Sequence, residues 1–140
     1  METRDAISLL SKIRDKVNRF ILSEMEKAGI DGIGTSHGDI LYALFYTPRL
    51  TMAEISSRIQ KDKSTVTALV EKLVRLGYVM KERDRHDARI VYVALTEKGM
   101  DLKPTFESIS NKVLSVFYSN IPTKEQKDLL TILNKINGNF

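Results

Sequence analysis

The sequence predicts a mainly α-helical protein with one small β-hairpin, an α+β fold in a single domain over residues 1–140. Apolar residues recur with the 3.6-residue period of amphipathic helices along most of the chain, and only the segment 78–95 changes to a period of about two. The 140 residues, 42% of them hydrophobic, are enough for the core of one ordinary domain. Only 3 Pro and 7 Gly interrupt the chain, which leaves room for long helices.

Two helices joined by a glycine-rich loop are expected at the N-terminus. Thr3 is predicted to cap a long first helix, which Gly29 ends. The loop that begins at Gly29 has the spacing G-x-x-G-x-G, but it follows a helix rather than a strand, so a plain interhelical loop is favoured over a phosphate-binding one. Ser36 and Asp39 resemble a capping box that opens a second helix, and Pro48 must end that helix.

The middle of the chain predicts a helix-turn-helix. Residues 51–54, Thr-Met-Ala-Glu, form a capping box for a short helix that ends near Ile59. After a two-residue turn, Asp62 is placed to cap the next helix, which runs to Leu76 and stops at Gly77. Two helices joined by so short a turn are typical of this motif.

A β-hairpin is predicted after the helix-turn-helix. The segments 78–83 and 90–95 are rich in β-branched and aromatic residues, and they flank the polar loop 84–89, Asp-Arg-His-Asp-Ala-Arg. Arg49 to Thr51 can supply a short third strand. A long helix is expected to resume after Thr96, with Pro104 either kinking it or moving its start later along the chain.

The terminal helices offer more apolar surface than one lobe can cover, which predicts a homodimer. Residues 1–30 and 98–140 are assigned to dimerisation, and residues 36–97 to a DNA-binding lobe. The second of these terminal segments carries a heptad-like seam in its first helix, and Thr123 and Gln126 open a last helix. The predicted interface residues are Ile13, Val17, Phe20, Val113, Val116, Phe117, Leu129, Leu133 and Ile136.

Positive charge is concentrated in one segment. Residues 58–89 hold nine Lys or Arg and five Asp or Glu, a net +4 that equals the formal net charge of the whole chain. Such a segment is either a solvated face or the docking site of a polyanion. The side chains on the helix that begins at Lys63 favour nucleic acid, because its exposed face carries small hydrogen-bonding groups that can approach base edges, with cations placed to reach phosphates.

The hairpin supports the same interpretation. A slim loop with arginines can enter a minor groove, and a recognition helix followed by a basic hairpin makes a winged helix. Asp62 is predicted to cap the recognition helix and also to hold a wing arginine in position. The candidate DNA-binding residues are Lys63, Ser64, Thr65, Thr67, Ala68, Lys72, Arg75, Arg83, Arg85, His86 and Arg89.

The order of these parts resembles the MarR family of bacterial and archaeal transcription regulators. The wing segment carries Asp87-x-Arg89 and Leu95-Thr96-x-x-Gly99, similar to that family's wing signature, and residues 62–67 resemble the start of its recognition helix. The resemblance implies a homodimeric repressor or activator that binds palindromic operators in double-stranded DNA. It implies that Arg89 enters the minor groove and is positioned by Asp62. It also implies that aromatic or phenolic anions release the DNA in many members.

Composition narrows the other possibilities. The chain has no Cys, which excludes thiol chemistry. It has only two His, which gives no indication of a metal site, and no other cofactor is indicated. No enzyme is therefore expected. Lys63-Ser64-Thr65 matches the end of a P-loop, but the glycines that form such a loop are missing. No secretory signal or membrane span is visible, so a cytoplasmic location is expected. The alternative function is a winged-helix protein interaction module.

One group of residues has two interpretations. Arg14, Tyr42, Phe45 and Tyr46 either line a pocket for a small aromatic effector or pack in the core. The sequence leaves both interpretations open.

Overall fold

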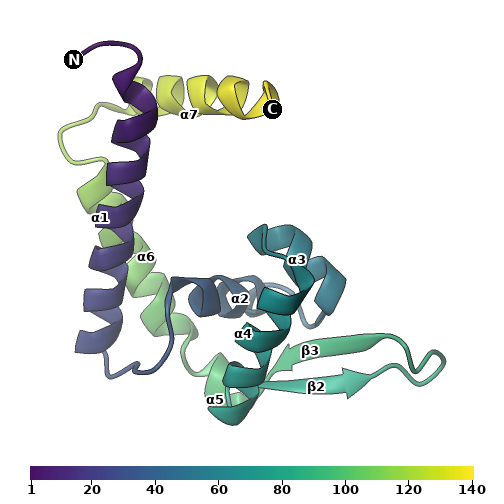
Figure 1. Cartoon of the computed structure of the whole chain (residues 1–140). Coiled ribbons are helices and arrows are strands. Elements are labelled where there is room, and N and C mark those ends of the chain that lie inside the picture. The colour runs from purple at the N-terminus through teal and green to yellow at the C-terminus, as the bar shows by residue number, and fades with distance from the viewer.

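The computed structural model describes residues 1–140 and places a lobe beside the long helices of the two terminal segments (Figure 1). It is mainly helical with one small antiparallel sheet, as the sequence predicts. The elements in chain order are α1 (Asp5–Lys27), α2 (Thr35–Phe45), β1 (Leu50–Thr51), α3 (Met52–Ile59), α4 (Lys63–Arg75), β2 (Val79–Arg83), β3 (Val91–Leu95), α5 (Glu97–Met100), α6 (Lys103–Phe117) and α7 (Thr123–Gly138).

The core of the lobe lies between α2, α3, α4 and the sheet. The strand order is β1-β3-β2, with Leu50 opposite Val93 and Val79 opposite Leu95, so the predicted hairpin and its short third strand are both confirmed. The predicted apolar stripe of α4 faces this core. The most deeply buried side chains of the lobe are Ile40, Leu41, Leu44, Leu50, Ile55, Val66, Val70, Leu73 and Val93.

Local sequence signals set the start of α3 and α4. The Thr51 hydroxyl accepts the Glu54 N–H at 3.1 Å, and the Glu54 carboxylate accepts the Thr51 N–H at 3.0 Å, which confirms the predicted capping box. Asp62 caps α4 as predicted, because its carboxylate accepts the Thr65 N–H at 2.8 Å. Gly77 ends that helix with φ +81, a conformation that glycine adopts without strain.

The predicted caps of α1 and α2 are wrong. Arg4, not Thr3, precedes α1, and no side chain caps that helix. Helix α2 begins at Thr35, so the proposed capping residue Ser36 already lies inside the helix. The His37 imidazole takes the role assigned to Asp39, since its Nδ1 accepts the Gly34 N–H at 3.0 Å.

The long helix expected after Thr96 is two helices. The short α5 ends at Met100, and α6 starts at Lys103 with Pro104 in its first turn, where the missing N–H of proline removes no helical hydrogen bond. Proline therefore delays the start of the long helix instead of kinking it.

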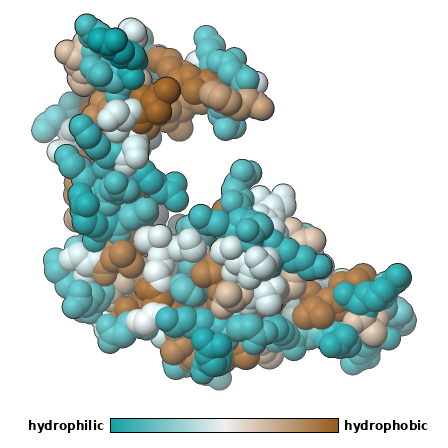
Figure 2. All heavy atoms as spheres, in the orientation of Figure 1, coloured by the Kyte–Doolittle hydropathy of each residue, from teal (hydrophilic) through white to brown (hydrophobic).

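The terminal helices are much less covered than the lobe. Helix α6 packs along α1, whereas α7 projects as an arm from the end of that pair (Figure 1). No residue of α7 is buried, and hydrophobic side chains gather at the surface of the arm (Figure 2). The exposed large apolar residues of α6 and α7 are Leu114, Val116, Phe117, Leu130, Ile132 and Ile136. None of the helices combines the length and apolar character that a membrane span needs.

Candidate nucleic-acid interface

Helix α4 and the β2–β3 hairpin lie side by side, and the hairpin loop extends away from α1 and α6 (Figure 1). Two hollows join them. One, of about 770 Å³, brings Lys63 at the start of α4 together with Arg89 of the hairpin. The second, of about 380 Å³, brings Thr67 of α4 together with Lys81 and Arg83 of β2. Residues far apart in the sequence thus form one concave, basic surface.

The exposed face of α4 has small side chains whose hydrogen bonds are partly committed. The Ser64 hydroxyl donates to Asp62 at 3.1 Å, and the Thr67 hydroxyl donates to the Lys63 carbonyl at 2.9 Å. Ser64, Thr67 and Ala68 are all exposed, and both hydroxyls keep free lone pairs. These groups can accept hydrogen bonds from base edges and contact a thymine methyl. Thr65 is half-buried and is less available for contact.

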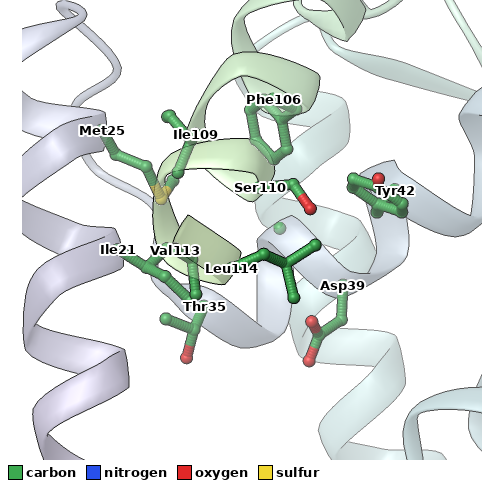
Figure 3. Close-up of a pocket in the computed structure, with 11 residues that line it drawn as sticks. Ile21, Met25, Thr35, Asp39, Tyr42, Phe106, Ile109, Ser110, Val113 and Leu114 are labelled. Carbon is green, nitrogen blue, oxygen red and sulfur yellow. The ribbon is translucent and has the colours of Figure 1, made fainter. Parts of the chain in front are cut away.

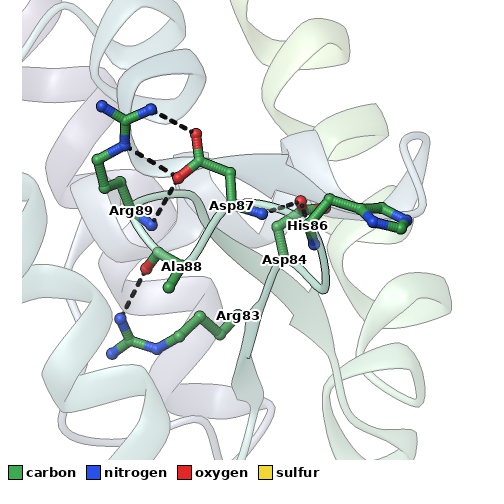
Figure 4. Close-up of polar contacts among 6 residues, drawn as sticks. All are labelled: Arg83, Asp84, His86, Asp87, Ala88 and Arg89. Carbon is green, nitrogen blue, oxygen red and sulfur yellow. Dashed lines mark hydrogen bonds and ion pairs between the residues drawn. The ribbon is translucent and has the colours of Figure 1, made fainter.

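The wing loop is held by hydrogen bonds among its own residues. The Asp84 carboxylate accepts the N–H groups of His86 and Asp87 at 3.1 and 2.9 Å (Figure 4). Arg83 donates to the Ala88 carbonyl at 2.7 Å across the base of the loop. Arg85 and His86 lie at the exposed tip. The loop therefore has a defined shape before any partner binds.

Arg89 forms a two-point ion pair with Asp87. Its Nε and Nη2 both donate to the Asp87 carboxylate at 3.0 Å, and its backbone N–H donates to the same group (Figure 4). These bonds lower the pKa of Asp87 and raise that of Arg89. The arginine side chain is still 90% exposed, so it is oriented without being covered.

The predicted contact between Asp62 and a wing arginine is absent, because the Asp62 carboxylate is used at the start of α4. It binds Thr65 and Ser64, and these hydrogen bonds lower its pKa. The residue that positions Arg89 in this structure is Asp87, two positions away on the same loop. Sequence spacing alone did not distinguish the two carboxylates.

The other cations of α4 and β2 differ in their availability, and one of them, Lys81, is not among the predicted DNA-binding residues. Lys81 of β2 forms an ion pair with Glu71 of α4, which lowers the pKa of Glu71 and ties the wing to the helix. Lys72 is half-buried and lies near enough to His37 that its charge, together with burial, lowers the pKa of that imidazole. Arg75 is exposed at the end of α4. Lys72 is therefore less open to a phosphate than the residues lining the two hollows.

Three residues that follow the wing, Thr96, Lys98 and Gly99, contact the segment at the C-terminal end of α4. The Thr96 hydroxyl donates to the Gly77 carbonyl at 2.5 Å, and Lys98 Nζ donates to the Leu76 carbonyl at 2.8 Å. Gly99 packs so closely that a Cβ there would lie 2.1 Å from the Tyr78 carbonyl oxygen. The sequence shows these residues as part of Leu95-Thr96-x-x-Gly99, but it assigns them no role. The structure links them to the position of the recognition helix.

The four residues considered for an effector pocket do not converge. A pocket of about 290 Å³ lies between α1, α2 and α6, and of the four only Tyr42 lines it. Phe45 is buried in the core, where its ring packs edge-on against Phe106. Tyr46 is exposed and donates to Glu107 at 2.7 Å, which raises its pKa. Arg14 borders a separate hollow that Tyr42 and Asp39 also line. Packing is thus the correct interpretation for Phe45.

Comparison with known proteins gives a consistent result. A family model described as "MarR family" matches residues 31–90, which span α2 to the wing loop. The transcriptional regulator SarZ of Staphylococcus haemolyticus is 30% identical over 100 residues, covering 71% of this chain and 67% of SarZ. SarZ of Staphylococcus saprophyticus is 33% identical over 102 residues, covering 72% of this chain and 68% of that protein.

Solved structures share the fold over almost the whole chain. A MarR transcriptional regulator from Methanosarcina mazei superimposes with a TM-score of 0.84 at 25% identity, covering 98% of this chain and 96% of that one. MepR of S. aureus, solved as a complex with DNA, superimposes with a TM-score of 0.87 at 22% identity, covering 95% and 96%. The arrangement of lobe, wing and terminal helices is therefore shared with regulators of this type.

Proposed function

This chain belongs to the MarR family of transcriptional regulators, which are DNA-binding proteins without enzymatic activity, and we propose that it binds a palindromic operator as a homodimer. In this proposal the lobe of residues 36–97 contacts the DNA, and residues 1–30 with 98–140 join the two subunits. Each lobe places α4 in a major groove and its wing in the adjacent minor groove.

The observation that carries the proposal is the pairing of α4 with the wing in two shared hollows. Thr67 faces the same hollow as Arg83, and Lys63 the same hollow as Arg89. Groups able to read base edges and groups able to bind phosphates or a narrow minor groove therefore lie on one surface. The ion pair with Asp87 presents the exposed Arg89 in a fixed orientation. The similar fold of MepR, solved as a complex with DNA, supports DNA as the partner.

Base reading and phosphate binding can be separated by substitution. Thr67→Ala should relax the base preference at defined operator positions, because it removes the hydroxyl and the methyl of an exposed residue on α4. Arg83→Ala should weaken binding to operator and random DNA alike and lower the salt slope by about one. Operators selected from a random DNA pool provide the substrates, and fluorescence anisotropy measures both affinities. Equal losses on operator and random DNA for Thr67→Ala would contradict the assignment of α4.

The apolar faces of α6 and α7 support the homodimer. Val116 of α6 is 60% exposed, and Leu130 of α7 is 59% exposed. Val113 is different, because it packs against the core of its own chain. Val116→Asp should give a monomer by sedimentation, because an unpaired carboxylate in an apolar interface is costly. Asn111→Asp, which adds the same charge to α6 at an exposed polar position, serves as the control and should stay dimeric.

A two-fold dimer also predicts the operator's geometry. Two recognition helices should lie about one DNA turn apart, near 10 base pairs centre to centre. Inserting five base pairs at the operator's centre turns one half-site to the opposite side of the duplex and should abolish tight binding. A folded monomeric variant that binds the full operator with undiminished affinity would contradict the proposal.

A small-molecule effector completes the proposal. The pocket between α1, α2 and α6 lies where the terminal helices meet the lobe. A ligand bound there would therefore favour one orientation of the lobe relative to the terminal helices. Binding of a small aromatic compound should lower operator affinity. A panel of such compounds tested by anisotropy, at constant salt, measures this effect.

A further inference from the structure

The pocket between the terminal helices and the lobe is lined by one negatively charged residue and no positively charged one. Helix α2 contributes Thr35, Asp39 and Tyr42, and α6 contributes Ser110, while no Lys, Arg or His lines the pocket. In Figure 3, Ser110 and Leu114 point from α6 toward Tyr42 and Asp39. The rest of the wall is apolar. Asp39 is therefore the single formally charged group that a ligand in this pocket would meet.

The Asp39 carboxylate has no ion-pair partner. Two cations, Arg14 and Lys61, act on it from the neighbouring hollow and favour its charged form, but neither lies within ion-pair distance. Burial outweighs them and raises the pKa of Asp39. The side chain is exposed where the pocket meets the neighbouring hollow, so a positive group in the pocket can reach this carboxylate.

Size and shape also limit the ligand. A volume of about 290 Å³ lies at the lower end of the range for small-molecule sites, roughly 300 to 1,000 Å³, so a compound with a single ring fits best. Tyr42 and Phe106 both line the pocket, and aromatic faces attract cations. An anionic ligand would instead meet the Asp39 carboxylate, and like charges repel.

From this lining we propose that the pocket binds a small apolar cation, an amine or quaternary ammonium group on a hydrophobic body, with Asp39 as its counter-charge and Tyr42 as its aromatic partner. The aromatic anions that the family resemblance implies are disfavoured by the same carboxylate. This inference deepens the proposed effector control and rests on it only for the effect on DNA. Ligand binding itself is measured on the DNA-free protein.

The direct test uses three single-ring probes of different charge. Benzyltrimethylammonium is permanently cationic, benzyl alcohol is neutral and salicylate is anionic. Calorimetric titration of the full-length protein should show the cation binding at least about tenfold more tightly than the other two. Stronger binding of salicylate, or no binding of the cation at millimolar concentration, would overturn the proposal.

Two variants locate the site. Asp39→Asn keeps the shape of the side chain and should reduce affinity for the cation about tenfold, while Asp31→Asn, which removes the same charge from an exposed loop residue outside the pocket, should leave it unchanged. Tyr42→Leu should also lower the affinity for the cation, because it removes the aromatic face. Unchanged cation binding in both Asp39→Asn and Tyr42→Leu would contradict the assignment.

The pH dependence gives an independent readout. Benzyltrimethylammonium does not titrate, so its affinity should rise as pH rises through the pKa of Asp39 and then level off, and the Asp39→Asn variant should show no such rise. A flat profile in the unaltered protein would argue against Asp39. Operator release is then measured separately: cation binding without release would leave the site intact and contradict only its regulatory role.

Discussion

The lobe and the terminal helices solve the problem of apolar surface in different ways. In the lobe, Leu41, Val66 and Leu73 are fully buried within one chain. In α7 no residue is buried, and Leu130 and Ile132 are more than half exposed. Both regions have amphipathic helices, but only the lobe buries most of its apolar side chains within one chain. The lobe is therefore stabilised by its own packing, whereas the terminal arm leaves apolar side chains exposed in the single chain.

The density of basic residues also differs between the two regions. The excess of basic residues falls in 58–89, within the lobe, while the exposed faces of α6 and α7 include large apolar groups. Salt screens charge but does not weaken apolar contact. The two regions should therefore respond to different solution conditions.

Salt should have the largest effect, and it should separate the two regions. If six to ten phosphates are neutralised per dimer, operator affinity should fall by about 10³ to 10⁵ between 50 and 200 mM salt. The dimer constant, measured by sedimentation over the same range, should change little. A flat DNA response would favour a protein interaction module, and a dimer that dissociates with salt would show that the subunits are joined by charge.

Matched leucine substitutions test the packing difference. Leu73→Ala should lower the free energy of unfolding by about 2 to 5 kcal/mol, because it leaves a cavity in a filled core. Leu130→Ala should change it by less than about 0.5 kcal/mol at dilutions where the chain is monomeric, and should become destabilising where dimers form. Chemical denaturation at several protein concentrations measures both. A concentration-independent cost for Leu130→Ala would show that α7 packs within its own chain.

The wing ion pair predicts a moderate effect on operator binding. Arg89→Ala should weaken it about 5- to 150-fold, and Asp87→Ala should lose part of the same binding, because Asp87 orients that arginine. The double variant should then be less than additive. A cycle between Arg89→Ala and Asp62→Ala should be additive, since Asp62 contacts only the start of α4. Coupling with Asp62 instead of Asp87 would show that the DNA-bound wing exchanges partners.

The smallest expected effect is a pH dependence of stability at the start of α2. The folded chain lowers the pKa of His37, first through burial and then through Lys72. The unfolded chain therefore binds more protons between the two pKa values, so stability is complete above about pH 6.5 and falls as pH drops below it. Protonated His37 also cannot accept the Gly34 N–H.

Thermal melts from pH 7.5 to 5.5 check this, with two glutamine variants. His37→Gln should flatten the dependence that this residue causes, because an amide does not titrate and can still accept the backbone hydrogen bond. His86→Gln, at an exposed residue of the wing, should leave the dependence as it is. If both variants keep the full pH dependence, the titration of His37 does not control α2.

Signals confined to a few neighbouring residues were sufficient for much of the fold. The capping box at 51–54, the Asp62 cap and the glycine stop at 77 are made by groups close in sequence, and the structure confirms each one. The change of period after Gly77 likewise located both strands of the hairpin. The α2 cap was missed because a histidine at the third helical position is a weaker sequence signal than a Ser-x-x-Asp pattern.

The sequence by itself determined where the helices and strands lie, which face of α4 is apolar and where the positive charge is concentrated. These properties depend on side chains within one or two turns of each other. Tertiary structure alone decided which carboxylate holds Arg89, that Lys98 and Gly99 fix the end of the recognition helix, and that Asp39 lines an apolar pocket. Each of these depends on the relative placement of elements or on the path of a loop, and that placement is set by packing of the whole core rather than by any local pattern.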